Sequence, residues 1–146
     1  MGKDKKKLTI GRREHIALPE LGLNDIVAKM DTGAYSSALY CHEVREENGC
    51  LFFRLLHPSY PNYDPKEHCF TEYGQKKVKN SFGIIETRFT IKTLLKIGKR
   101  QIISVFSLTD RSDMRYPVLI GRKVLKNRFI IDVALVNTLT TTTRKA

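Results

Sequence analysis

Short apolar segments alternate with turn-forming residues along the chain, and this pattern constrains the fold more than any other feature. Residues 8–10 and 15–18 are short apolar runs on either side of a polar turn. Asn48-Gly49 and Gly98-Lys99 each separate two longer runs, as the turns of β-hairpins do. No internal repeat and no linker between two cores is visible. The pattern therefore predicts one all-β domain of short strands, closed or orthogonally packed.

The other expected elements follow from the same pattern. We expect strands at residues 25–30, 36–44, 50–56, 84–97, 100–108, 117–121 and 128–136, a turn at 19–24, and one helical turn at 122–126. Residues 57–80 carry three prolines and many charges, which predicts a long loop with short pairing segments. In domain terms, we expect a disordered basic leader at 1–7, a single domain at 8–137 and a polar tail at 138–146.

Composition limits the class of protein. A chain of 146 residues is long enough to bury a hydrophobic core without help from disulfide bonds or metal ions. Its three cysteines are too few for a disulfide scaffold. No apolar run approaches the roughly 18 residues that cross a bilayer, and the basic N-terminus lacks the apolar stretch of a secretory signal. We therefore expect a cytoplasmic protein that does not span a membrane.

The net charge is the strongest compositional signal. The chain has 26 Lys and Arg against 15 Asp and Glu, a formal net charge of +11. Such a charge attracts anions, which include nucleic acid, anionic membranes and acidic peptides. Composition alone leaves these three open. No glycine-rich nucleotide loop, GxSxG, HExxH or CxxC is present.

The segment AKMDTGAYSS carries the clearest chemical signal. Asp31 follows an apolar strand, and Thr32-Gly33-Ala34 can form a tight turn that presents its carboxylate. The same three residue types also form ordinary β-turns, so this motif alone does not define a catalytic site. Two carboxylates about 3 Å apart share one proton and can activate water against a carbonyl. The chain has one Asp-Thr-Gly, so a two-fold homodimer would have to supply the second carboxylate.

A second segment, YPVLIGR, follows about 85 residues later. Together with AKMDTGAYSSAL, KNSFGIIETRFTI and RFIIDV, it resembles the retropepsin-like aspartic peptidases over most of residues 10–135. The match is closest to a bacterial branch named "ATP-dependent zinc protease", whose members are linked to the ribosomal-protein glutamate ligase. The resemblance implies an acid-protease β-barrel with one short helix near the C-terminus, in which the VLIG segment threads beneath the Asp loop as a psi-shaped loop.

The resemblance also assigns roles by position. Asp31 corresponds to the catalytic aspartate, with Thr32 and Gly33 in its supporting loop and Ala34 beside the substrate. Residues 81–86, with Gly83, correspond to the substrate-covering flap. The implied substrates are acidic, glutamate-rich peptides. Arginine binds carboxylates through two parallel hydrogen bonds, which makes four arginines candidates for substrate binding: Arg88, Arg111, Arg115 and Arg122.

The sequence supports neither zinc nor ATP. The candidate zinc ligands are Cys41, His42, Cys50, His57, His68 and Cys69, and their spacing matches no standard zinc site. We expect no cofactor and no metal. Two other functions remain open: a non-catalytic module of the same fold that binds a ligase or the ribosome through its basic surface, and a basic RNA-binding domain. The positive charge supports the RNA-binding domain, but no RNA-binding motif does.

Overall fold

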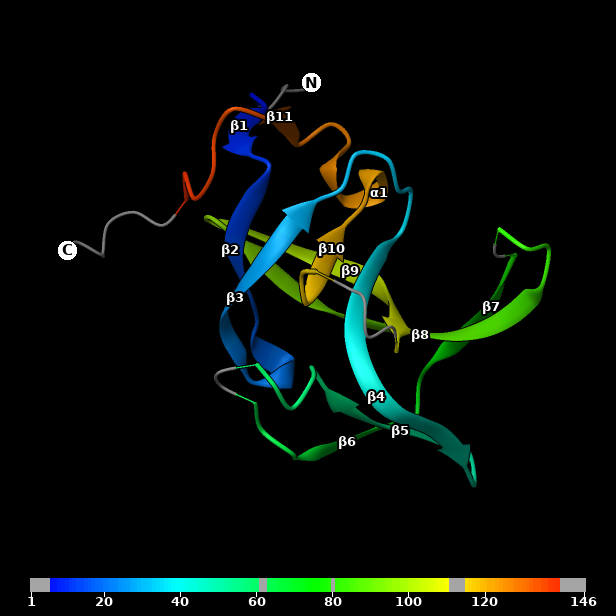
Figure 1. Cartoon of the computed structure of the whole chain (residues 1–146). Coiled ribbons are helices and arrows are strands. Elements are labelled where there is room, and N and C mark those ends of the chain that lie inside the picture. Colours follow the sequence, from blue (N-terminus) through cyan, green and yellow to red (C-terminus); the bar gives the residue numbers. More distant parts are fainter. Residues whose placement is uncertain (1–5, 61–62, 80, 111–114, 140–146) are drawn as a thin grey trace, which may run out of the picture.

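Six β-strands close into a barrel in the computed structural model, which describes residues 6–60, 63–79, 81–110 and 115–139 (Figure 1). Around the barrel the strands follow the order β10 (Val118–Ile120), β3 (Leu23–Met30), β2 (Arg13–Leu18), β8 (Ile85–Ile97), β9 (Arg100–Thr109) and β4 (Ser37–Glu47). Pairing between β4 and β10 closes the ring. The closed all-β barrel predicted from the sequence is confirmed. The short helix near the C-terminus is α1 (Arg122–Leu125).

Three groups of paired strands lie outside this barrel. The distal half of β4 pairs with β5 (Cys50–Leu55), which pairs with β6 (Glu67–Phe70). The first half of β8 pairs with β7 (Gly74–Lys79), and this hairpin projects away from the barrel (Figure 1). β1 (Leu8–Gly11) and β11 (Phe129–Asp132) form a separate parallel pair. A 3-10 helix, Pro19–Leu21, connects β2 and β3.

Alternation of buried and exposed residues explains why the strands close around a core. Along β2, every second side chain is buried, and β5 repeats the same pattern. The largest fully buried apolar side chains include Phe53, Phe106 and Leu39. Burying one such side chain stabilises the fold by about 1.5–3 kcal/mol. Asn48 and Gly49 both have positive φ, at 51° and 77°, as the tight hairpin turn between β4 and β5 requires.

The C-terminal part of the chain differs from the prediction. One strand was expected over residues 128–136, but β11 ends at Asp132. The carboxylate of Asp132 accepts a hydrogen bond of 2.9 Å from the amide of Ala134 and so stabilises a turn. Beyond the turn, the carbonyl of Leu135 accepts a hydrogen bond from the amide of Arg12. The segment therefore folds back onto the start of the barrel instead of continuing the strand.

The predicted loop at 57–80 contains the expected pairing segments, which are β6 and β7. Most of the predicted leader and tail, residues 1–5 and 140–146, lies outside the described residues. At the start of the predicted tail, the backbone amides of Thr138 and Leu139 donate to the buried carboxylate of Glu14. Ordered contacts with the barrel therefore continue to Leu139.

Candidate active site

Asp31 lies directly after β3, at the start of a loop that leads to β4. Its amide donates a hydrogen bond of 2.8 Å to the carbonyl of Ile120, and its carbonyl accepts one of 3.1 Å from Ala34. The amide of Gly33 lies 3.2 Å from the Oδ1 atom of Asp31. The backbone therefore fixes both the position of Asp31 and the direction of its carboxylate.

Strand β10 lies beneath the loop that starts at Asp31 and supports it. β10 pairs in parallel with β3 and antiparallel with β4, so it passes between the two strands that the loop connects. At its end, a Cβ atom on Gly121 would lie 2.5 Å from the carbonyl oxygen of Ser36. The amide of Arg122 then donates to Ala34, at 2.8 Å, and that of Lys123 donates to Tyr35, at 3.0 Å. This crossing is the psi-shaped arrangement that the sequence resemblance implied.

Arg122 supports the Asp31 loop rather than a ligand cavity. Its Nη1 donates a hydrogen bond of 3.1 Å to the carbonyl of Thr32. Its guanidinium also lies over the ring of Tyr35, at 5.8 Å from the ring centroid. Both interactions cross-link α1 to the loop, and Arg122 is not among the residues that line the cavity next to Asp31.

The carboxylate of Asp31 faces a cavity of about 610 Å³. Asp31 is the sole acidic residue among those that line this cavity. Five basic residues surround the same space: Arg12, Lys29, Lys76, Arg88 and Arg115. Its wall also holds the hydroxyl of Thr109, which is buried and has no hydrogen-bond partner among the described residues. Because basic groups outnumber the single carboxylate, the cavity favours an anionic ligand.

The structure brings together four of the residues named from the sequence: Asp31, Ala34, Arg88 and Arg115 all line the cavity. Thr32 and Gly33 lie exposed on the loop beside it.

Two of the other named residues, Gly83 and Arg122, do not line the cavity. Gly83 lies in the turn between β7 and β8, with φ of 83°, and does not line the cavity. The two strands of that hairpin contribute Lys76, Val78 and Arg88 to the cavity. Arg122 lies behind the loop, and Arg111 is outside the described residues.

Three basic residues of the cavity were missed or misjudged. Lys76 lies in the segment that was expected to be a long loop, and no role was assigned to it from the sequence, but its Nζ donates a hydrogen bond of 2.9 Å to the hydroxyl of Ser36. Lys29 lies two residues before Asp31, so its place on β3 was a usable signal. Arg12 is brought in by a tertiary contact, because its Nη1 donates to the carbonyl of Val133. The sequence contains no local signal for that contact.

The candidate zinc ligands do not fit a zinc centre. Both ring nitrogens of His42 are engaged, Nδ1 with the carbonyl of Leu56 at 2.7 Å and Nε2 with the hydroxyl of Tyr63 at 3.1 Å. Burial raises the pKa of the Cys41 thiol well above its usual value, which disfavours the thiolate that zinc requires. Among the described residues, no three His, Cys, Asp or Glu side chains converge on a point that could hold a metal ion.

No helix within the described part of the chain has the length and apolar character needed to cross a bilayer.

The chain is similar to a solved structure and to curated proteins. The crystal structure of Lpg0085, a protein of unknown function (DUF785) from Legionella pneumophila, is 27% identical, with a TM-score of 0.69. The similarity covers 92% of this chain and all of that one. A "Probable alpha-L-glutamate ligase" from Desulfotalea psychrophila is 34% identical over 140 residues, which are 92% of this chain and 30% of the ligase.

A second protein of the same name, from Parasynechococcus marenigrum, is 32% identical and is matched over 28% of its length. This chain therefore spans less than a third of the curated relatives that it matches. A family model described as "Retropepsin-like aspartic endopeptidase RimB" matches residues 9–142. The psi-shaped crossing beneath Asp31 and this match over nearly the whole chain lead to one conclusion: the chain belongs to the RimB-like family.

Proposed function

We propose that the protein is an aspartic endopeptidase that cleaves acidic, glutamate-rich peptides and acts as a homodimer. The observation that carries this proposal is the setting of Asp31. It is the single carboxylate of a cavity lined by five basic side chains, on a loop held by the psi-shaped crossing. That setting supports both parts of the proposal, peptide-bond hydrolysis and a preference for acidic substrates.

Hydrolysis needs a second carboxylate, and we propose that the Asp31 of a second copy supplies it. Two adjacent carboxyl groups share one proton, because both cannot ionise side by side. The ionised carboxylate takes a proton from water as the water oxygen bonds to the peptide carbonyl carbon. The protonated carboxyl group gives its proton to the carbonyl oxygen. When the C–N bond of the resulting tetrahedral intermediate breaks, the nitrogen takes the proton that the first carboxylate received from water and leaves as an amine. One hydroxyl group of the intermediate returns its proton to the other carboxylate, which restores the shared proton.

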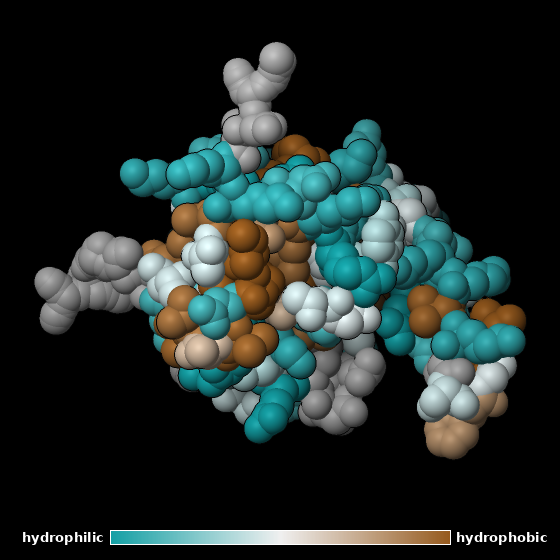
Figure 2. Space-filling view, turned by 90° about the horizontal axis from the view of Figure 1, so that it is seen from above, coloured by the Kyte–Doolittle hydropathy of each residue, from teal (hydrophilic) through white to brown (hydrophobic). Residues whose placement is uncertain are grey.

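The end of the barrel that carries Asp31 is suited to contact a second copy. The Asp31 loop, α1 and the β1–β11 pair lie at the same end (Figure 1). Seen from above, this end shows a hydrophobic patch beside a broad hydrophilic band (Figure 2). Ile130 of β11 and Val133 in the turn that follows are 52% and 71% exposed. Burial of such side chains against a second copy would favour dimerisation.

The basic side chains around Asp31 support the acidic substrate class. Arg88 is half-buried and lies 3.4 Å from Glu86, a contact long enough for a substrate carboxylate to replace. Arg115 lies on the same cavity wall as Tyr116. A guanidinium that pairs with a carboxylate through two hydrogen bonds fixes both the charge and the orientation of the ligand.

The direct test is cleavage of an oligoglutamate peptide, followed by mass spectrometry of the products. Wild-type protein should cleave within the glutamate run, and Asp31→Asn should be inactive while it keeps the melting temperature and circular dichroism spectrum of the wild type. Full activity of Asp31→Asn would overturn the assignment. Sedimentation analysis with and without peptide tests the dimer, since a protein that stays monomeric with bound peptide could not pair two Asp31 carboxylates.

A second candidate function is a non-catalytic module that binds a ligase or the ribosome. The curated relatives favour it, because in two proteins named as ligases the segment that matches this chain is 28–30% of the ligase's own length. Both candidates assume a cytoplasmic location. This function predicts that the wild-type protein and the Asp31→Asn variant bind a separately expressed glutamate ligase, or ribosomes, equally well, and that neither cleaves an acidic peptide.

A further inference from the structure

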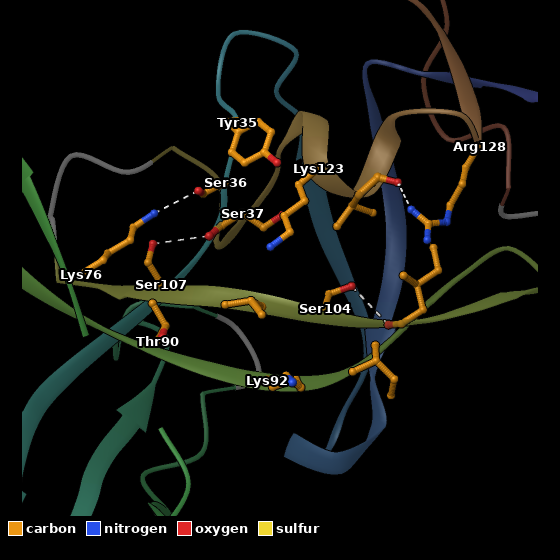
Figure 3. A pocket seen from close by; sticks show the side chains of 14 residues that line it. Tyr35, Ser36, Ser37, Lys76, Thr90, Lys92, Ser104, Ser107, Lys123 and Arg128 are labelled. Carbon is orange, nitrogen blue, oxygen red and sulfur yellow. Dashed lines mark hydrogen bonds between the residues drawn. The ribbon is translucent and has the colours of Figure 1, made fainter. Parts of the chain in front are cut away.

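A second cavity, of about 460 Å³, adjoins the cavity of Asp31 (Figure 3). The two cavities share three lining residues, Ser36, Lys76 and Ser107. In Figure 3, Lys76 reaches across to Ser36 at the boundary between them. A chain that leaves the Asp31 cavity at this boundary therefore enters the second cavity directly.

The second cavity is basic and holds no acidic residue among those that line it. Its cations come from four different elements or connections: Lys76, Lys92, Lys123 and Arg128. The side chain of Lys123 points from α1 into the cavity, opposite β9 (Figure 3). Arg128 is anchored on one side by a hydrogen bond of 2.8 Å from Nη1 to the carbonyl of Val124. None of these four lysine and arginine side chains forms a salt bridge among the described residues.

Part of the cavity wall is aliphatic. Ile103 and Val105 of β9 line it and are 62% and 38% exposed, although they are apolar. Glutamate side chains combine two methylene groups with a terminal carboxylate, so they can pack on such a wall while their charges reach the lysines. A single-stranded nucleic acid would also bind through stacking of its bases on several aromatic side chains, but Tyr35 is the sole aromatic residue that lines this cavity.

We propose that this second cavity is a docking site for the acidic segment of the substrate that extends beyond the bond to be cleaved. The proposal rests on the proposed function, because it concerns a peptide whose cleavage point lies at Asp31. The proposal predicts that the affinity for a glutamate peptide depends on the length of the peptide. A run of glutamates that occupies both cavities binds more tightly than a short peptide that occupies the Asp31 cavity alone.

The test is binding of two fluorescent peptides to the Asp31→Asn protein, so that neither peptide is cleaved. One is a glutamate tripeptide, and the other is an oligoglutamate of about ten residues, which spans roughly 33 Å when extended. The variant Lys92→Gln/Lys123→Gln changes two exposed side chains of the second cavity. Lys99→Gln/Lys126→Gln is the matched control for charge, since both lysines are exposed and line neither cavity.

We expect the Lys92/Lys123 variant to weaken binding of the long peptide by about three- to tenfold, given the modest strength of exposed ion pairs. The tripeptide should be unaffected, and the control variant should change neither affinity. Equal affinity of the Lys92/Lys123 variant and the control for the long peptide would overturn the proposal. So would a Lys92/Lys123 variant that loses binding of a single-stranded RNA oligonucleotide but keeps that of the peptide.

Cleavage of the tripeptide and of the long peptide by the protein with Asp31 intact separates this proposal from the function it rests on. If neither peptide is cleaved although the long one binds through Lys92 and Lys123, the peptidase function fails and the docking site stands. If both are cleaved with equal KM, the function stands and the docking site fails.

Discussion

The amide of Gly121 donates a hydrogen bond of 3.0 Å to the hydroxyl of Ser37, and both residues are buried. Gly121 follows β10 and Ser37 begins β4, so this bond joins the two strands beneath the Asp31 loop. The carbonyl of Ser37 in turn accepts a hydrogen bond of 3.3 Å from the hydroxyl of Ser107 on β9. The loop that presents Asp31 is therefore supported by three strands of the barrel.

Gly121→Ala should destabilise the protein and abolish any activity that depends on Asp31. The backbone of Gly121, with φ −93° and ψ 178°, is open to any residue, so the requirement is steric. A Cβ atom there would lie 2.5–2.6 Å from the carbonyl oxygens of Ser36 and Tyr35. Displacement of the packed backbone should cost about 1–3 kcal/mol of unfolding free energy, measured by urea denaturation.

Gly33→Ala is the matched control for that substitution. A Cβ atom on Gly33 would lie no closer than 3.5 Å to its nearest neighbour, the Oδ1 atom of Asp31. The control should keep the wild-type stability to within about 0.5 kcal/mol. If Gly121→Ala proved as stable as Gly33→Ala, close contact at the crossing would not be what holds the Asp31 loop.

Glu14→Gln should destabilise the attachment of the C-terminal segment. The buried carboxylate of Glu14 accepts hydrogen bonds from the amide of Gly11 at 2.6 Å, and from the amide and hydroxyl of Thr138 at 3.1 and 2.7 Å. Its other oxygen accepts one from the amide of Leu139 at 3.0 Å. Glutamine would replace one of these acceptor oxygens with an NH₂ group that faces hydrogen-bond donors. We expect this to lower the free energy of unfolding by about 1–3 kcal/mol.

Urea denaturation and hydrogen exchange of the Thr138 and Leu139 amides would measure this effect. Glu72→Gln makes the same chemical change at an exposed position and should leave both measurements unchanged. Unaltered exchange at Thr138 in Glu14→Gln would show that the carboxylate is not the anchor of this segment.

Local signals in the sequence were sufficient for much of the fold and for the centre of the site. Asn48-Gly49 marks a hairpin because both residues must adopt positive φ, and Asp31-Thr32-Gly33 marks a loop at a strand end. Long-range contacts were not visible in the same way. The burial of Glu14 depends on a backbone segment more than 120 residues away, and no local pattern encodes that.

The cavity around Asp31 shows the same division between local and long-range information. Arg88 and Arg115 were identified because they lie in or beside segments that resemble the peptidase family, and both line the cavity. Lys76 and Arg12 were not, because the pairing of β7 with β8 and a contact with Val133 bring them there. A basic residue in a predicted loop has no visible partner until the sheet pairing is known.

Arg115→Gln should raise KM for acidic peptides and leave kcat nearly unchanged, because its charge acts on the bound substrate rather than on the bond that breaks. We expect an increase of about two- to fivefold, given the energy of an exposed ion pair. Lys126→Gln removes the same charge from an exposed residue outside both cavities and should have no effect. A fall in kcat at constant KM would instead place Arg115 in the chemical step.

Stability should fall as the pH drops below 6.5, in part because of His68. Burial, followed by the charge of Lys66, lowers the pKa of His68 from its usual 6.5, and Asp64 opposes this shift. The unfolded chain therefore binds the proton more readily than the folded protein. The stability contributed by neutral His68 is present above pH 6.5 and is lost as the pH falls through the lower pKa of the folded state.

His68→Phe removes this titration and keeps the stacking of ring 68 on Phe53, where the ring centroids lie 5.5 Å apart and nearly parallel. The melting temperature should therefore fall less between neutral and mildly acidic pH in the variant than in the wild type. The quantity to compare is the change in melting temperature between the two pH values, because phenylalanine also changes the stability at neutral pH. His57→Phe makes the same change at a histidine outside this stack, and it should keep the acid sensitivity of the wild type. Equal acid sensitivity of His68→Phe and the wild type would show that protonation of His68 is not the step that destabilises the fold.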